Sequence, residues 1–161
     1  MATVADDGTF PDVDGRSLDG TSYELPGDFD GALNLVLVAF RREQQADVNT
    51  WVPTARRLED DYPGLRYYEL PVIDRLYGPV RPFIDDGMRR GVPDELARRR
   101  TITLYLNVTA FRRSLDLPTE DAIYALLVDR EGTVHWGTDG PRTDAAERAL
   151  EGVIDDRLEP R

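Results

Sequence analysis

The chain has 161 residues, a hydrophobic content of 40% and a net charge of −11, and it contains no cysteine. This length fits one domain around a single core. The missing cysteine excludes disulfides, thiolate nucleophiles and thiolate metal ligands, and the single histidine, His135, excludes a zinc site built from several histidines. We expect no cofactor and no metal site, and the acidic charge argues against non-specific binding to nucleic acids.

All 20 basic residues are arginines. Two explanations stay open. A lysine-free, acidic surface is typical of a halophilic protein, because at about 1 M salt the Debye length is only about 3 Å and self-repulsion is weak. The base composition of the genome also replaces lysine with arginine. No apolar stretch reaches the roughly 18 residues of a membrane span, and the first residues have no signal-peptide pattern, so we expect a cytoplasmic protein.

The first part of the chain predicts a tail, a hairpin and a central strand. We expect a flexible tail at residues 1–9 and a single domain at residues 10–161. Turn signals at Asp14-Gly15 and Asp19-Gly20 predict a hairpin before Pro26. The continuous apolar run at residues 34–40 predicts a strand that is buried on both faces, as the central strands of mixed sheets are.

A polar turn at residues 41–45 follows this strand and leads into a helix. Apolar residues at spacings of three and four predict one buried stripe on that helix, formed by Val48, Trp51, Val52, Ala55, Leu58 and Tyr62. Pro53 lies inside the helix and is expected to kink it. Residues 66–73 predict a second strand, in which Pro71 indicates an edge or an exit.

The segment from 74 to 100 is the least regular. Residues 75–84 predict a short helical piece that is broken by Pro79 and Pro82, and residues 86–91 predict a turn. The sequence Pro93-Asp94-Glu95 is typical of a helix start.

The last part of the chain predicts further alternating elements: strands at 101–106, 122–128 and 133–136, a short helix at 109–115, and a closing helix capped by Thr143. A strand–helix–strand unit followed by a hairpin and a final helix is the order of a thioredoxin-like α/β fold, with a central mixed sheet flanked by helices.

The N-terminal hairpin, the strand that ends in Phe40 and the helix that contains Pro53 resemble the start of peroxiredoxin-type and thioredoxin-type domains. This resemblance implies that Gln45 and Val48 stand where the two thiols of a redox pair would lie. A glutamine amide and an isopropyl group supply no thiolate, so thiol-disulfide exchange and peroxide reduction are excluded.

The second half resembles the mitochondrial ATP synthase assembly factor family called ATPase assembly factor ten. The resemblance covers roughly residues 51–150. It rests on the order and spacing of short motifs: Gly87-Met88-Arg89, Thr101-Ile102-Thr103-Leu104-Tyr105, Phe111, Leu115-Asp116-Leu117, Tyr124-Ala125-Leu126-Leu127-Val128-Asp129, Gly132-Thr133-Val134-His135-Trp136 and Gly140. It implies a thioredoxin fold without redox activity that helps a membrane-embedded ATP synthase subunit to assemble in mitochondria. No transit peptide is recognised in this sequence.

The local charge pattern is the best signal for a site. Residues 75–113 carry a net charge of +5, which leaves −16 on the remainder of the chain. An arginine cluster on an acidic protein is able to bind carboxylates or phosphates in a bidentate way, but pairing with the protein's own acids is the interpretation that we favour. Met88 is either an exposed apolar contact or a side chain that fills a gap in the core. The candidate binding residues are Arg75, Arg81, Met88, Arg89, Arg90, Arg98 and Arg99.

Three functional hypotheses follow. The first is a non-redox, thioredoxin-fold binding protein with an assembly-factor or chaperone-type role, whose unknown protein partner contacts the arginine-rich surface at 75–113. The alternative is a thiol-free enzyme that acts on a small anionic substrate at the end of the central strand, through Arg41, Arg42, Glu43 and Gln45. The third is self-association, in which the acidic face of one copy meets the arginines of another. His135 and the carboxylate pairs are more typical of structural and solvated positions than of sites.

Overall fold

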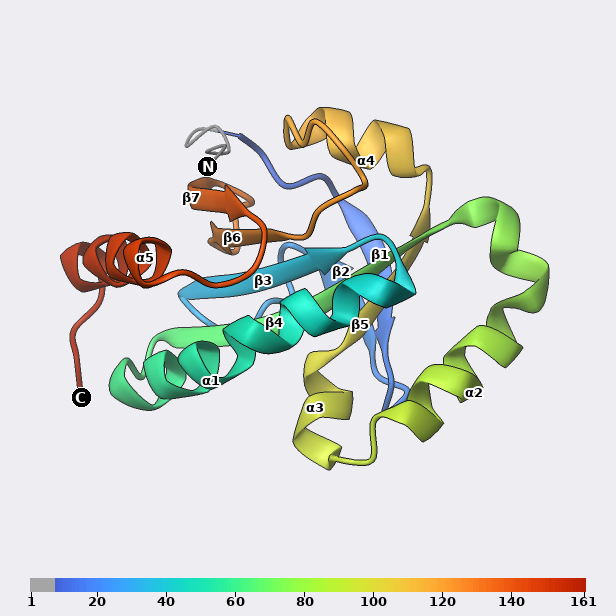
Figure 1. Cartoon of the computed structure of the whole chain (residues 1–161), viewed down its shortest axis with the longest axis horizontal. Helices are drawn as coiled ribbons and strands as arrows, with labels where there is room; N and C mark the ends of the chain where they lie inside the picture. Colours follow the sequence, from blue (N-terminus) through green and yellow to red (C-terminus); the bar gives the residue numbers. More distant parts are fainter. Residues whose placement is uncertain (1–7) are drawn as a thin grey trace.

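Seven strands form one mixed sheet in the computed structural model, which describes residues 8–161 (Figure 1). Their order in the sheet is β2-β1-β5-β4-β3-β6-β7. Residues 1–7 of the expected tail lie outside the described residues, whereas Gly8 and Thr9 run beside the start of the last strand. The strands are β1 (Val13–Ser17), β2 (Ser22–Leu25), β3 (Leu33–Ala39), β4 (Leu65–Asp74), β5 (Ile102–Leu106), β6 (Tyr124–Val128) and β7 (Val134–Asp139).

Strand β3 lies inside this sheet with a paired strand on each side, as the sequence predicts. It pairs in parallel with β4 and antiparallel with β6. Because side chains alternate between the two faces of a strand, Leu35 and Leu37 enter the core on one face and Val36 and Val38 enter the core on the other. A run of apolar residues without alternation is therefore buried on both sides.

Helices cover both faces of the sheet. The helical elements are η1 (Arg42–Gln44), α1 (Gln45–Asp61), η2 (Arg75–Val80), α2 (Arg81–Gly91), α3 (Glu95–Arg100), α4 (Val108–Ser114) and α5 (Asp144–Arg157). The apolar stripes of α1 and α5 pack on one face, around Trp51, and α4 packs on the other through Phe111. As expected, Thr143 caps α5, because its hydroxyl accepts a hydrogen bond from the backbone N–H of Ala146.

The prediction of a turn at Asp14-Gly15 is wrong, because both residues lie inside β1. Gly15 is needed there for close packing rather than for a turn. A Cβ at Gly15 would lie 2.5 Å from Cγ2 of Ile102 and 2.7 Å from Cδ2 of Leu104, both on the neighbouring β5. The second signal, Asp19-Gly20, does form the hairpin turn, and Gly20 has a φ of +94°.

The segment between β4 and α3 also differs from the prediction. Residues 86–91 form the second half of α2 rather than a turn. Pro82 does not break a helix but stands at its start, where no intrahelical N–H bond is lost. Pro71 lies in β4 opposite Ala39, the last residue of β3, and β4 is an interior strand rather than an edge.

Candidate functional site

The turn that follows β3 is held to the loop that precedes β6. The side-chain oxygen of Gln44 accepts hydrogen bonds from the backbone N–H groups of Phe40 and Arg41, at 2.8 and 3.2 Å. Its amide nitrogen donates to the carbonyl oxygen of Glu120 at 2.7 Å, and Arg41 forms a salt bridge with Asp121 at 2.6 Å. Because Gln44 is buried and both polar atoms of its side chain are hydrogen-bonded, the turn is tied to that loop, and it is called the closed turn below.

The two positions implied by the thiol-carrier resemblance face different surroundings. Gln45 is the first residue of α1 and is exposed, and its amide donates to Asn49 at 2.9 Å and to Glu69 at 3.1 Å. Val48 is buried in the apolar core. Burial raises the pKa of Glu69, and the hydrogen bond from Gln45 only partly offsets that rise.

Arg41, Arg42 and Glu43, the other residues of the enzyme hypothesis, are exposed on the same turn. Neither of the two clefts described below includes any of them or Gln45. A small anionic substrate would meet a solvated turn here rather than a concave site with converging polar groups.

The strongest indication of a binding site in the structure is a group of exposed apolar side chains. Residues 75–91, which form η2 and α2 and are called the η2–α2 arm below, curve away from the sheet between β4 and α3 (Figure 1). Neither element contains a buried residue. Four large apolar side chains on the arm are exposed to solvent: Leu76 (81%), Tyr77 (57%), Val80 (44%) and Phe83 (80%).

The sequence prediction missed these four residues. Leu76, Val80 and Phe83 stand at i, i+4 and i+7, so a continuous helical reading of the segment would have placed them on one face. The prediction of breaks at Pro79 and Pro82 obscured this periodicity. The next turns of α2 show a second, inward face, on which Ile84 and Met88 are half-buried.

The inward face is anchored to the sheet through Arg81. Its guanidinium lies 4.4 Å from the centre of the Tyr105 ring on β5, and it pairs with Asp85 at 3.6 Å. The Tyr105 hydroxyl donates to the same Asp85 carboxylate at 2.9 Å. Burial and this hydrogen bond raise the pKa of Tyr105 above its ordinary value, so the hydroxyl keeps its proton at neutral pH.

Two of the candidate arginines join backbone segments to one another. Arg98 donates to the carbonyl oxygens of Val92 (2.5 Å) and Arg89 (2.7 Å) at the C-terminal end of α2. Arg89 donates to the carbonyl oxygen of Leu18 at 3.1 Å. Both residues border a cleft of about 470 Å³, lined by Leu18, Asp19, Arg89, Glu95, Arg98 and Arg99.

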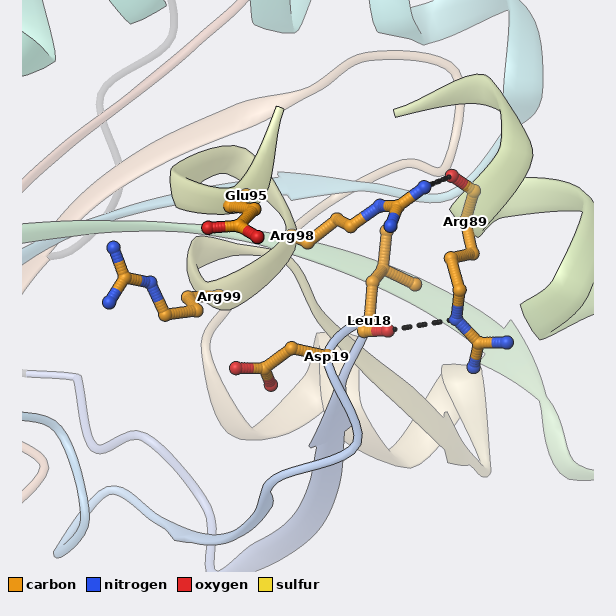
Figure 2. A pocket seen from close by; sticks show the side chains of 6 residues that line it. All are labelled: Leu18, Asp19, Arg89, Glu95, Arg98 and Arg99. Carbon is orange, nitrogen blue, oxygen red and sulfur yellow. Dashed lines mark hydrogen bonds between the residues drawn. The ribbon is translucent and has the colours of Figure 1, made fainter. Parts of the chain in front are cut away.

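In that cleft the arginines do not converge on one point. Figure 2 shows the guanidinium of Arg98 directed to the carbonyl oxygen of Arg89, whereas the side chains of Arg89 and Arg99 point away from each other. The acids Asp19 and Glu95 lie between them. A group that binds one phosphate or carboxylate needs donors aimed at a common position, and this cleft does not provide them.

The other arginines of the segment divide between paired and solvated positions. Asp86 pairs with Arg90 and also with Arg89, at 3.7 Å from the latter. Arg100 pairs with Glu59 at 2.6 Å. Within residues 8–161, Arg75 and Arg99 form no salt bridge. The structure thus spreads the seven candidate residues over an arm, a helix end and a cleft rim instead of gathering them.

A second cleft, of about 870 Å³, lies between the β1–β2 hairpin, Arg81 at the start of α2 and Tyr105 on β5. Its lining includes the tyrosines Tyr23 and Tyr105 and the arginines Arg16 and Arg81. It also includes the acids Asp14, Glu24 and Asp28. Both signs of charge therefore line this cleft, and it shows no preference for an anion.

The remaining candidates have structural surroundings. The ring of His135 lies 2.9 Å from the carboxylate of Asp129. Trp136 packs edge-on against Trp51, with ring centres 6.2 Å apart. In the part of the chain that the structure describes, no group of three or more metal-ligating side chains occurs, and no helix is long and apolar enough to cross a membrane.

No protein-family model and no curated protein matches the sequence. Among solved structures, the chain is similar to a thiol:disulfide interchange protein from Bacteroides sp. (TM-score 0.62, 19% identity, 94% of this chain and 91% of that chain). It is also similar to a putative electron transport protein from Aquifex aeolicus (TM-score 0.64, 9% identity, 95% and 99%). A third similar structure is BsSco, a member of the Sco family of cytochrome c oxidase assembly proteins (TM-score 0.62, 11% identity, 92% and 93%).

These similarities extend over nearly the whole chain, and they agree with the mixed sheet and its two helical layers. At such low identity these similarities indicate the fold but not the activity. The chain has a thioredoxin-like fold, and it carries no cysteine with which to perform the thiol chemistry named for several of its structural neighbours.

Proposed function

We propose that this chain is a thioredoxin-fold binding protein that works without redox chemistry, and that the η2–α2 arm is its partner-binding surface. The observation that carries the proposal is the exposure of Leu76, Tyr77, Val80 and Phe83 on an arm without a buried residue. Large apolar side chains exposed together on one short segment are typical of an interaction site, because leaving them in water costs free energy that a partner recovers.

The closed turn after β3 supports the same proposal. In this chain Gln44 joins that turn to the loop before β6, and Gln45 and Val48 supply no nucleophile. The enzyme hypothesis needs a concave site at this turn, and Arg41, Arg42 and Glu43 are instead exposed. Loss of the chemistry together with retention of the scaffold favours a binding role.

An assembly-factor or chaperone-type role is the form of binding that we favour. Its support is the resemblance of the second half to the ATP synthase assembly factor family, and the similarity of the fold to BsSco, which is described as belonging to a family of cytochrome c oxidase assembly proteins. A cytoplasmic location and a halophilic origin stay predictions from composition.

Affinity purification from the native cell, in about 1 M salt, tests the proposal. The tagged chain is compared with the double variant Leu76→Ser/Phe83→Ser, whose substitutions remove apolar surface but no core contact. We expect the variant to lose the proteins that the wild type retains. The control variant Thr109→Ser/Ala110→Ser changes two exposed residues of α4 to the same residue type and should retain them. Retention of every protein by the arm variant would contradict the proposal.

A further inference from the structure

The η2–α2 arm also indicates which partner it binds. We infer that its occupant is a second copy of this chain, and that two copies associate arm to arm about a two-fold axis. This inference rests on the proposed function, since it takes the arm as the binding surface. It names the partner, which the proposed function leaves open.

The exposed apolar side chains are able to form a self-complementary contact. Leu76, Tyr77 and Val80 lie on the 3₁₀ helix η2 and Phe83 lies on the first turn of α2, so the four side chains follow one another along the arm. In a two-fold contact the same patch serves both copies, so the patch of one copy packs against its equivalent in the other. No second, complementary patch has to exist elsewhere on the molecule.

The size of the surface is sufficient. At the exposures observed, the four residues present about 500 Å² of mostly apolar surface in each copy. Two copies would bury up to about 1,000 Å² from these residues, which reaches the lower end of specific protein interfaces. Because the centre of such a contact would be apolar and aromatic, it would match the composition of interface cores.

The charges of the arm are partly compensated within it. Arg81 pairs with Asp85, and Arg89 and Arg90 share Asp86, so the four arginines and two aspartates of the arm leave a net charge of +2. At about 1 M salt the repulsion that this charge causes between two arms is screened.

The rest of the molecule favours the same geometry. Outside residues 75–113 the chain carries a net charge of −16, so most other contacts between two copies would bring acidic surfaces together. The outer edge of β2 is also occupied, because both backbone polar groups of Glu24 are hydrogen-bonded to Asp28. The Glu24 N–H donates to the Asp28 carboxylate, and the Glu24 carbonyl oxygen accepts from the Asp28 N–H. Strand addition at this edge is therefore blocked at its centre.

Salt dependence separates this contact from the alternative in which the arginines of one copy meet the acids of another. An apolar contact between two copies of charge −11 strengthens when salt screens their long-range repulsion. A contact made of salt bridges weakens under the same change.

Sedimentation velocity of the full chain across protein concentration, at about 0.1 M and about 1 M salt, is the test. We expect a monomer–dimer equilibrium whose dissociation constant falls at the higher salt. In Leu76→Ser/Phe83→Ser the dissociation constant should rise at least about 100-fold, because each copy loses two central side chains. Thr109→Ser/Ala110→Ser should leave it unchanged. Circular dichroism then confirms that both variants remain folded.

The absence of cysteine allows a second, independent measurement. In the variant Val80→Cys the single thiol lies between Leu76 and Phe83 along the arm, where the axis would bring it close to its equivalent in the other copy. We expect mild oxidation to convert most of this variant to a covalent dimer. The variant Ala110→Cys, on α4, should remain largely monomeric under the same conditions.

Three outcomes would overturn the inference: a monomer at protein concentrations up to about 1 mM in high salt, a dimer that survives Leu76→Ser/Phe83→Ser, or a dimer that dissociates when salt is raised. A monomeric wild type whose arm variant still loses its captured proteins would refute only the second copy as partner. A monomeric wild type whose arm variant retains them would refute the proposed function as well.

Discussion

Strand β3 and the η2–α2 arm are both rich in apolar side chains, but they lie in opposite environments. Leu37 on β3 is fully buried, whereas Leu76 on the arm is 81% exposed. The difference arises because β3 has a paired strand on each side and a helical layer on each face, while the arm leaves the sheet and no segment within residues 8–161 covers its outer side. An apolar side chain is buried only where another segment of the fold covers it.

The same two regions differ in their ion pairs. The sheet and the helices that cover it are called the body below. In the body, the Glu147 carboxylate on α5 pairs with Arg142 at 2.9 Å and with Arg57 on α1 at 3.6 Å. The Thr54 hydroxyl also donates a hydrogen bond to Glu147. On the arm, the pairs Arg81–Asp85 and Arg90–Asp86 are confined to α2 itself. Local pairs stabilise a helix only weakly, so the arm is expected to open more readily than the body.

The largest expected effect contrasts the two regions directly. Leu37→Ala should lower the free energy of unfolding by about 2–5 kcal/mol, because it leaves a cavity in a closely packed core. Phe83→Ala should change it by less than about 0.5 kcal/mol, because its ring is 80% exposed. Urea unfolding followed by tryptophan fluorescence, at low protein concentration, measures both. A cost above about 1 kcal/mol for Phe83→Ala would show that the arm is packed and would remove the contrast.

The second effect tests the closed turn after β3. Gln44→Ala should lower the free energy of unfolding by about 1–3 kcal/mol, because the backbone N–H groups of Phe40 and Arg41 and the carbonyl of Glu120 lose their partner. The neighbouring Gln45→Ala is the control, since Gln45 is exposed and its removal should cost less than about 0.5 kcal/mol. Equal costs for the two variants would mean that Gln44 does not hold this end of the sheet together.

The third effect concerns the ion pairs of the body. Hydrogen bonds from Arg142 and Thr54 lower the pKa of Glu147 from 4.5 to about 2. The ionised carboxylate therefore stabilises the fold above pH about 4.5, and this contribution is lost as the pH falls towards about 2. Allowing for partial solvent exposure, Glu147→Gln should cost about 1–2 kcal/mol at neutral pH.

The difference between wild type and Glu147→Gln should shrink by more than half at pH about 3, where the carboxylate contributes less. Urea unfolding at both pH values tests this. The exposed Glu159→Gln serves as the control and should show no such change. A difference that stays constant with pH would exclude the ion pair as its cause.

The smallest predicted effect is an increase in stability rather than a decrease. In Gly87→Ala the new Cβ meets nothing within 4 Å, so α2 should gain about 0.5–1 kcal/mol from the better helix propensity of alanine. Amide hydrogen exchange in residues 81–91 should slow about two- to fivefold. The same change in the body, Gly31→Ala, places a Cβ 2.4 Å from the carbonyl oxygen of Leu33 and should destabilise. Unchanged exchange in α2 would show that helix propensity does not limit the stability of the arm.

Much of the fold was predictable because its signals are local. The apolar run at 34–40 predicts a central strand, the stripe that begins at Val48 predicts α1, and Thr143 predicts the start of α5. The prediction was wrong where a local signal has two uses. Glycine forms a turn at Gly20, whereas Gly15 allows close packing between strands. Proline often ends a helix, whereas Pro82 lies in the first turn of α2.

The candidate site was predictable only in part. The charge pattern drew attention to residues 75–113, which include the arm, but the arginines themselves proved to have different partners: Arg98 binds backbone carbonyls, Arg90 pairs with Asp86, and Arg75 is solvated. The exposed apolar residues were missed, since an apolar residue in a sequence carries no label that separates a core contact from a surface contact.

By itself the sequence determined the thioredoxin-like order of strands and helices and the lack of a thiol, because both depend on residue types and on spacings within short segments. Only the tertiary structure decided that Gln44 binds the carbonyl of Glu120, 76 positions further along the chain, and that Leu76 and Phe83 face solvent. Burial and pairing depend on which distant segments the fold brings together, and a local pattern does not contain that information.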